Sequence, residues 1–464
     1  MSGTNRIDNG LDRKETVIQI KPENGYDGFE GWGTSLAWWG HIIGRWSSPE
    51  KLDEIMDLIF DEDKGLGLNI IRYNIGGGEN PEIRPNTLRP GGDVPGFQPE
   101  KGIWNWSADE GQRYVLLAAM KRGADIAEAF SNSPPYWMTI SGSVTGAEDG
   151  GNNLREECYE QFADYLTEVV KHYKDVHGVV FRTLNPLNEP ISNWWKKGNI
   201  QEGAHFSLDK QMEIIKQTAR SLQLKGLTET AVSAPDENSV DETLEMLHGY
   251  DEETFRSFSQ INTHSYNGIQ LEEIRKLAQE KGKKLWMSEY GTGGTGPHDH
   301  EDMSSVMELA ERVITDLRLL RPAAWVYWQA VEDESAQNNW GFIHSDFRNG
   351  DSQYEITKQY YAMAQFSKFI RPGSRILWQD DRDSIAAYHA ARKQLTVVVH
   401  NREGQRQIGY DLGRFAMDAA SAKLYRTSEQ ENLVEAELFI NSNKFTINLE
   451  ARSVTTVVIS NITL

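Results

Sequence analysis

The sequence Thr183-Leu-Asn-Pro-Leu-Asn188-Glu189-Pro190 places a glutamate where a β-rich run gives way to turn residues, and Lys284-Leu-Trp-Met-Ser-Glu289-Tyr290-Gly291 repeats this arrangement later in the chain. Proline lacks the amide hydrogen that a strand ladder needs, so Pro190 ends the first run. In a barrel of alternating strands and helices, catalytic side chains stand at the carboxyl ends of the strands. The two runs therefore predict a pair of facing carboxylates, the pair that glycosidic bond hydrolysis requires.

Alternating strand and helix patterns fill the region around these two runs, from residue 25 to residue 369. Short β-rich runs and long amphipathic stretches follow one another, which is the pattern of βα units around a parallel sheet. The predicted strands span 29–36, 68–75, 125–131, 181–189, 231–236, 261–266, 284–290 and 323–330. The predicted helices include 49–60, 109–122, 154–172, 208–224 and 304–320. Eight such units predict an α/β fold that closes as a (β/α)8 TIM barrel.

The pattern changes after residue 370. Short alternating strands at 385–389, 395–400, 444–449 and 454–459 predict a β-sandwich side domain over residues 370–464. An early strand at 15–20 precedes the barrel and has no partner there, so we expect it to join the side domain. Because no low-complexity linker separates the two parts, we expect them to pack rigidly together.

The composition excludes several classes of partner. The 464 residues include 69 acidic and 48 basic side chains, which give a formal charge of -21. This charge repels phosphate backbones and anionic lipids, so we expect no nucleic-acid or membrane partner. No run approaches the roughly 20 apolar residues of a transmembrane helix. The first ten residues lack an apolar signal segment, which leaves a cytoplasmic location for the chain as it stands, or an extracellular one if a signal has been removed.

The residues around the two glutamates suggest separate roles. Glu189 is a candidate general acid, and the amide of Asn188 can hold a sugar hydroxyl beside it. Glu289 lies in an apolar and aromatic run, where a charged side chain needs a function or a partner. Arg72 is a charge inside an apolar strand, and it can keep a nucleophilic carboxylate such as Glu289 ionised. A purely structural ion pair at Arg72 is the alternative.

Aromatic residues and a histidine complete the candidate binding site. His264 and Tyr266 are two residues apart on a predicted strand, so their side chains project to one face. The chain contains 14 tryptophans, and flat aromatic faces suit the C–H faces of pyranose rings. We expect most of these tryptophans to lie in the core, with Trp32, Trp137 and Trp328 as candidates for stacking on a sugar.

Three other patterns compete with this interpretation. Residues 291–296 fit the glycine fingerprint of dinucleotide sites, but no helix start follows them, so we expect no NAD. Residues 298–302 contain two histidines and three acids, which leaves a metal-dependent hydrolase as an alternative to a solvated loop. The single cysteine, Cys158, lies in a predicted helix and is expected to be inert. We therefore predict neither a metal nor an organic cofactor.

With these motifs the chain resembles glycoside hydrolase family 30. Asn188-Glu189-Pro190 matches the acid/base motif of that family, and Ser288-Glu289-Tyr290 matches its nucleophile motif. Ser133-Pro-Pro-Tyr-Trp-Met138 matches the loop after the third barrel strand. The resemblance covers nearly the whole chain. It implies a (β/α)8 barrel with a side β-sandwich, built from the C-terminal segment and a short N-terminal piece, and a retaining double displacement.

Within the family, the segments 31–39 and 72–78 look most like the endo-β-1,6-galactanase branch, which attacks the β-1,6-galactan side chains of arabinogalactan. Relatives with similar loops act on β-1,6-glucan, glucosylceramide, xylan or β-xylosides, and these activities remain alternatives. So does a barrel that binds carbohydrate without cleaving it. The expected partner is an oligo- or polysaccharide, and the sequence carries no signal for an oligomeric state.

Overall fold

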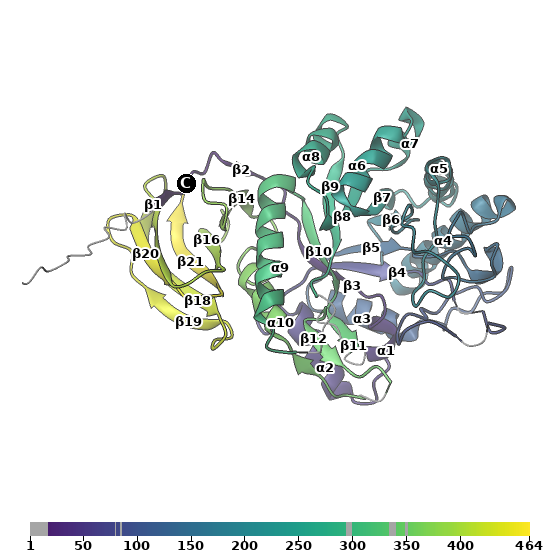
Figure 1. Ribbon diagram of the computed structural model, residues 1–464, viewed down its shortest axis with the longest axis horizontal. Helices are drawn as coiled ribbons and strands as arrows, with labels where there is room; N and C mark the ends of the chain where they lie inside the picture. The colour runs from purple at the N-terminus through teal and green to yellow at the C-terminus, as the bar shows by residue number, and fades with distance from the viewer. Residues whose placement is uncertain (1–16, 79, 84–85, 294–298, 334–339, 349–350) are drawn as a thin grey trace, which may run out of the picture.

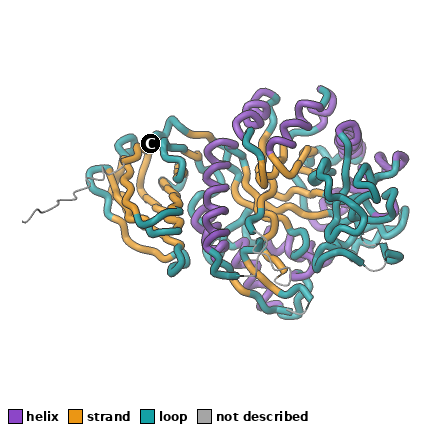
Figure 2. Tube along the Cα trace, viewed as in Figure 1, coloured by secondary structure: helices purple, strands orange, loops and turns teal. Residues whose placement is uncertain are grey.

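The computed structural model describes residues 17–464 except 79, 84–85, 294–298, 334–339 and 349–350. Figure 1 shows a ring of strands and helices on one side and a domain made of strands on the other. Figure 2 separates the two parts by their secondary structure, since helices surround the strands of the first and are missing from the core of the second. None of the described helices is long and apolar enough to cross a membrane.

Eight parallel strands close into a barrel, as the sequence predicts. They are β3 (Gly31–Ser35), β4 (Ile70–Asn74), β5 (Ile126–Phe130), β6 (Thr183–Asn185), β7 (Ala231–Ser239), β8 (Gln260–Asn267), β9 (Lys284–Tyr290) and β10 (Ala324–Gln329). Strand β10 pairs with both β9 and β3, which closes the ring. Strand β6 is shorter than its predicted range because Pro186 has no N–H to donate. Glu189 therefore lies in the loop beyond β6.

Helices surround the barrel. They are α1 (Gly40–Ile43), α2 (Pro49–Phe60), α3 (Glu110–Met120), α4 (Tyr159–His177), α5 (Leu208–Leu224), α6 (Val240–Gly249), α7 (Glu252–Ser257), α8 (Leu271–Glu280), α9 (Met303–Thr315) and α10 (Lys358–Ser367). The bounds of α2 and α5 agree with the predicted ranges. Ser48 caps α2 by accepting from Lys51 N, and Pro49 occupies its first turn. Helix α4 begins and ends five residues later than predicted. Its last residue is His177, and Gly178 caps it in the left-handed conformation with φ +68°.

The side domain contains two sheets. The smaller has the order β1 (Val17–Gln19), β17 (Arg406–Asp411), β20 (Lys444–Leu449). The larger has the order β19 (Val434–Leu438), β18 (Ala416–Thr427), β21 (Ser453–Thr463), β16 (Gln394–Asn401), β15 (Ser384–His389), β14 (Arg375–Leu377), β2 (Gly25–Tyr26). Strand β1 pairs in parallel with β17, so the early strand finds its partner here. Residues 15 and 16 of that predicted strand lie outside the described residues.

Helices α9 and α10 pack between the barrel and the side domain (Figure 1). The ammonium group of Lys358, at the start of α10, is buried and donates to Ser428 O and to Asn432 Oδ1. Further along α10, Gln365 donates to Thr427 Oγ1, and its main-chain oxygen accepts from Thr456. Because buried polar groups need partners, these contacts fix the side domain against the barrel.

A small sheet follows the last barrel strand. It consists of β11 (Val331–Asp333), β12 (Ile343–Ser345) and β13 (Glu355–Ile356). Strand β11 pairs in parallel with β12, which pairs antiparallel with β13. This sheet leads the chain from the barrel to α10.

Candidate active site

The two glutamates come from strands that β7 and β8 separate in the barrel. Glu289 is the sixth residue of β9, and Glu189 follows β6 with a positive φ of +48°. Its main chain is fixed on both sides, since Glu189 N donates to Asp236 O at 2.8 Å and Trp195 Nε1 donates to Glu189 O at 2.8 Å. A left-handed conformation at a residue other than glycine persists where the surroundings hold it, and such residues gather at functional sites.

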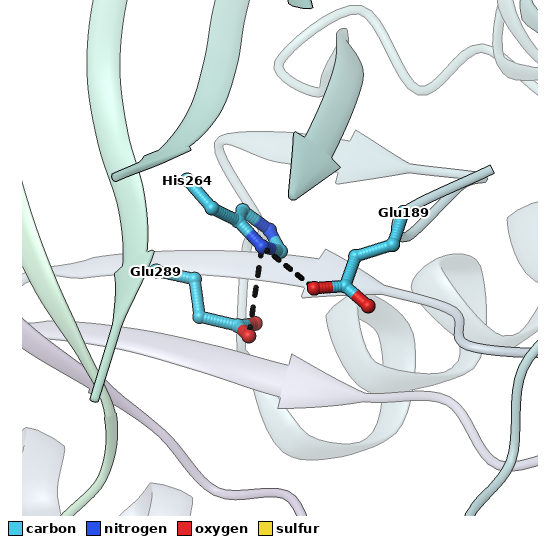
Figure 3. Close-up of side chains that lie close together, drawn as sticks. All are labelled: Glu189, His264 and Glu289. Atoms are coloured by element: carbon cyan, nitrogen blue, oxygen red, sulfur yellow. Dashed lines mark hydrogen bonds and ion pairs between the residues drawn. The ribbon is translucent and has the colours of Figure 1, made fainter. Parts of the chain in front are cut away.

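His264 lies between the two carboxyl groups (Figure 3). Its Nδ1 is 3.3 Å from Glu189 Oε1 and 3.6 Å from Glu289 Oε1. One oxygen of each glutamate and a nitrogen of His264 all lie within 4.8 Å of one another. The two acids are therefore neighbours at the bottom of one site.

Glu289 receives hydrogen bonds from two sides. Arg72 Nη1 donates to Oε2 at 3.2 Å, and Tyr266 OH donates to Oε1 at 3.1 Å. Arg72 also contacts Glu128 at 3.1 Å and Asp236 at 2.5 Å, and it is fully buried. The ion pair between Arg72 and Glu289 is thus present. Arg72 lies beneath the glutamates, and its full burial excludes Arg72 as a substrate-binding residue.

The charges in this cluster shift several pKa values. Burial opposes protonation of His264, but Glu289 and Asp236 outweigh it and raise the pKa of His264 to about 10. Burial works against ionisation of Asp236 as well, yet Arg72 and His264 lower its pKa to about 2. Burial raises the pKa of Glu289 to about 7, and Glu189 adds to the rise, against the effects of His264 and Arg72. His264 is therefore a buried imidazolium held between carboxylates.

A cleft of about 220 Å³ opens above the two glutamates. Five of its residues are tryptophans, and five besides Glu189 and Glu289 carry amide or carboxyl groups. It is lined by Trp38, Asn132, Asn188, Glu189, Trp194, Trp195, Gln201, Glu202, Asn238, Tyr266, Glu289, Trp328 and Trp340. Aromatic walls with a few polar groups suit a sugar ring, which offers C–H faces and hydroxyl edges.

The structure brings most of the predicted site residues together. Asn188, Tyr266 and Trp328 line the cleft with the two glutamates. His264 is fully buried, so it touches the carboxylates from below instead of the ligand. Asn238, which the sequence analysis missed, donates to Glu189 Oε1 at 2.7 Å.

Two predicted stacking residues lie elsewhere. Trp32 is fully buried, donates to Ile370 O and packs against Trp325 and Phe366, so it belongs to the core. Its side chain points away from the barrel interior toward α10. Trp137 is half-buried, donates to Gln98 O and is not among the lining residues of the cleft. The expectation that Trp32 stacks on a sugar is therefore wrong, because its indole is fully buried, whereas stacking by Trp137 stays a prediction.

Several lining residues escaped the sequence analysis for a common reason. Trp38, Trp340 and Glu202 come from loops whose course depends on tertiary packing. Asn132 offered a detectable signal, since it follows strand β5 as Asn188 follows β6. The signal for Asn238 was weaker, because it lies beyond the predicted end of strand 231–236. In the structure β7 continues past that end through register shifts and a positive φ at Asp236.

The donor groups do not fit a divalent metal. Glu189, His264 and Glu289 lie close enough to share an ion. However, both ring nitrogens of His264 already face carboxylates, with Nδ1 near Glu189 and Glu289 and Nε2 3.3 Å from Asp236 Oδ1, so the ring is placed as a partner of these acids rather than as an ion ligand. In the other candidate, 298–302, His298 lies outside the described residues, as do 294–296 of the glycine fingerprint. There Asp302 caps α9, Glu301 pairs with Lys358 and His300 pairs with Glu355.

An eight-stranded α/β barrel with two adjacent glutamates in an aromatic cleft has the architecture of a glycoside hydrolase. Comparisons with known proteins agree. The model for O-glycosyl hydrolase family 30 matches residues 15–264. An endo-β-1,6-galactanase from Hypocrea rufa is 31% identical, over 97% of this chain and 96% of that protein. The chain therefore belongs to O-glycosyl hydrolase family 30, and it is a glycosidase.

A second sequence relative and a solved structure are also similar to this chain. An exo-β-1,6-galactobiohydrolase from Bifidobacterium longum is 24% identical, over 89% of this chain and 36% of that longer protein. Among solved structures, a conserved exported protein from Bacteroides fragilis superposes with a TM-score of 0.80 at 21% identity, covering 96% of this chain and 100% of the other. The second likeness supports the fold, including the side domain.

Proposed function

We propose that this protein is a retaining endo-β-1,6-galactanase that acts on the galactan side chains of arabinogalactan. The observation that carries the mechanism is the spacing of the glutamates, whose nearest oxygens lie within 4.8 Å of each other. Retaining enzymes hold their carboxyl groups about 5–5.5 Å apart, whereas inverting enzymes leave about 6.5–9.5 Å for a water molecule. The short separation favours direct attack by one carboxylate.

In the first step, a carboxylate oxygen of Glu289 attacks the anomeric carbon and the bond to the leaving oxygen breaks. Glu189 gives its proton to that oxygen. In the second step, Glu189 takes a proton from water, whose oxygen attacks the same carbon and releases Glu289. Two inversions restore the original configuration.

The hydrogen bonds of the two glutamates support this division of roles. Glu289 accepts from the guanidinium of Arg72 and from Tyr266, while Glu189 accepts from the amide of Asn238 and lies 3.3 Å from His264 Nδ1. The ion pair with Arg72 favours the ionised form of Glu289, the form that a nucleophile needs.

The substrate is inferred from the relatives. The Hypocrea rufa protein is named for endo cleavage of β-1,6-galactan, and the Bifidobacterium longum protein for release of β-1,6-galactobiose. Both names share the sugar and the linkage. The nearly complete overlap with the first relative favours internal cleavage over terminal cleavage.

Product analysis tests the proposal. The protein would be incubated with β-1,6-galactan, β-1,6-glucan, xylan and glucosylceramide, and the products separated by size while proton NMR follows the anomeric configuration. We expect a ladder of β-1,6-galacto-oligosaccharides that appear first as β-anomers. Release of α-anomers would overturn the retaining mechanism, and preferential cleavage of another glycan would overturn the substrate.

A further inference from the structure

A third carboxyl group, that of Glu202, lines the cleft and has no part in the displacement. Glu202 belongs to the loop between β6 and α5, the loop that also carries Glu189. Its neighbour Gly203 lies against Trp195, where an added Cβ would come within 2.0 Å of the indole. Trp195 in turn donates to the main chain of Glu189. Close packing therefore fixes the position of Glu202 relative to the acid.

The two oxygens of Glu202 have different surroundings. Oε2 accepts from Gly77 N at 3.4 Å, in the loop after β4. Oε1 has no hydrogen-bond partner among the described residues, although the side chain is 98% buried. A buried polar atom without a partner is costly, and a residue that lines a cleft can gain that partner from a ligand. Oε1 therefore has the capacity for one more hydrogen bond, and it belongs to a residue that lines the cleft.

The surroundings of Glu202 favour the neutral acid. Burial raises the pKa of its carboxyl group well above the usual range, and Asp93 and Asp109 add to the rise. The phenol of Tyr165 is also close enough for Glu202 to contribute to the rise of its pKa. Because Oε2 accepts from a main-chain N–H, the proton resides on Oε1. The neutral group presents a donor to the cleft.

The other lining residues agree with a neutral ligand. Among the described residues around the cleft, three carry carboxyl groups and none is a lysine or arginine. An acidic sugar would lose its hydration there without gaining a cationic partner. Amide oxygens of Asn132 and Asn188, which also lack hydrogen-bond partners among the described residues, can accept from hydroxyl groups. The described lining residues therefore offer donors and acceptors, and none of them is a lysine or arginine. The nearest cations lie behind them, with Arg72 and His264 beneath the glutamates and Arg89 over the ring of Trp38.

We propose that Glu202 is a specificity-determining residue, which hydrogen-bonds through Oε1 to a hydroxyl group of a neutral sugar and disfavours uronic acids. The proposal rests on the glycosidase function and deepens it by naming the class of sugar that the cleft accepts.

Two substitutions at Glu202 test the hydrogen bond. Glu202→Gln keeps an oxygen for Gly77 and turns an N–H donor to the cleft, so we expect kcat/KM on the best neutral glycan to remain within about threefold of the wild type. Glu202→Leu keeps the volume but has no donor, and we expect kcat/KM to fall about tenfold, mainly through KM. Asp316→Asn serves as the matched control, because Asp316 is a buried acid with a raised pKa on the far side of β8 from the cleft.

The pH dependence separates a ligand contact from a structural role. KM of the wild type should rise at alkaline pH, where Glu202 ionises and loses its donor, whereas KM of Glu202→Gln should not. Equal damage in both variants, or the same pH dependence of KM in both proteins, would overturn the proposal. If Glu202→Leu fails to fold, the comparison of wild type with Glu202→Gln still decides.

Competition tests the preference for neutral sugars. β-1,6-Galactobiose should inhibit at a concentration at least tenfold lower than glucuronosyl-β-1,6-galactose at pH 7. Equal inhibition by the two would refute the selection against acids. Failure of the wild type to cleave any glycan in the panel would remove the proposed function and this inference together, while normal cleavage with no effect of Glu202→Leu would remove this inference alone.

Discussion

The barrel interior and the core of the side domain are both buried, but the first contains charged side chains beneath the site and the second contains apolar ones. Below Glu189 and Glu289, the barrel contains the fully buried side chains of Arg72, Glu128 and Asp236. The single carboxylate of Glu128 accepts hydrogen bonds from all of Arg72, Thr183, Ser233, Gln260 and Asn262. The core of the side domain instead contains alternate apolar residues of β16 and β21, such as Leu395 and Val457, while residues of the opposite face, such as Val398, belong to the apolar cluster shared with the barrel.

The difference shows what each interior is for. Alternating apolar residues stabilise a sandwich through the area that they remove from water, and they position no chemistry. Buried charges contribute little net stability even when paired, but removing one partner exposes the cost of the others. The barrel thus holds a charge network that orients the carboxyl groups of Glu189 and Glu289.

The most damaging change should be at the nucleophile. Glu289→Ala leaves no group to form the glycosyl intermediate, so we expect kcat to fall by at least about 10⁴-fold on every substrate. The midpoint temperature of thermal unfolding should be unchanged or slightly higher, since the substitution removes a buried acid whose pKa is raised. Residual turnover within a factor of about 100 of the wild type would show that another residue attacks.

Glu189→Ala sharpens the same prediction, because it removes proton transfer and leaves the nucleophile. The variant should be nearly inactive on polysaccharide but should regain its first step on a dinitrophenyl glycoside, whose leaving group needs no proton. Azide should then rescue the second step and give a β-glycosyl azide. An inverted azide product, or no difference between the two substrates, would contradict the assigned roles.

A pair of core substitutions compares the two interiors directly. Arg72→Met leaves Glu128 and Asp236 buried without their counter-charge, and we expect the free energy of unfolding to fall by about 3–5 kcal/mol, together with loss of activity. Leu395→Ala should also reduce that free energy, by about 2–5 kcal/mol, but should leave kcat unaltered at temperatures where the variant is folded. Urea unfolding and kinetic measurements on both variants check this. Loss of catalysis in folded Leu395→Ala would show that the two interiors are not independent.

Asp236 should give the barrel network a pH signature. Its pKa is lowered to about 2 in the folded protein, against an ordinary value of 3.8. A lowered carboxyl pKa contributes stability that is complete above pH 3.8 and is lost as the pH falls through 2, by about 2 kcal/mol in total. Asp236→Asn should lack this acid-dependent loss when unfolding is measured between pH 5 and pH 2. An identical acid profile in the two proteins would remove Asp236 from the account.

The smallest effect is expected at the rim of the cleft. Trp194 lines the cleft and is 40% exposed, so Trp194→Ala should raise KM by about fivefold through lost stacking, with little change in thermal stability. Trp32→Ala is the matched control. It should destabilise the protein by about 3–5 kcal/mol because that indole is wholly inside the core. A loss of stability in Trp194→Ala together with a raised KM in a stable Trp32→Ala would contradict the roles given to the two tryptophans.

The sequence predicts the parts of the site that depend on strand periodicity. Glu189, Glu289 and Asn188 sit where a strand pattern ends, and the direction of parallel strands brings such ends to one rim. Arg72 and His264 are inside strands, where the pattern gives a face but not a depth. Their burial, and the contacts that follow from it, depend on which residues fill the barrel beneath them.

The aromatic residues mark the limit of that approach. Trp32 and Trp328 both occupy barrel strands, but one points outward to α10 and the other reaches the cleft. A register shift between Tyr327 and Gln329 accompanies the second case. Loop residues such as Trp340 carry no periodic signal at all, because their position depends on contacts made with distant parts of the chain.

The buried ammonium group of Lys358 has a consequence for how this architecture can be inherited or engineered. Its acceptors, Ser428 O and Asn432 Oδ1, belong to the side domain, while Lys358 itself opens a helix of the barrel. A barrel separated near residue 370 would leave that cation without these acceptors against an uncovered apolar seam. The side domain is therefore not a separable module that recombination could exchange for another. An engineered protein that uses this barrel should include both domains.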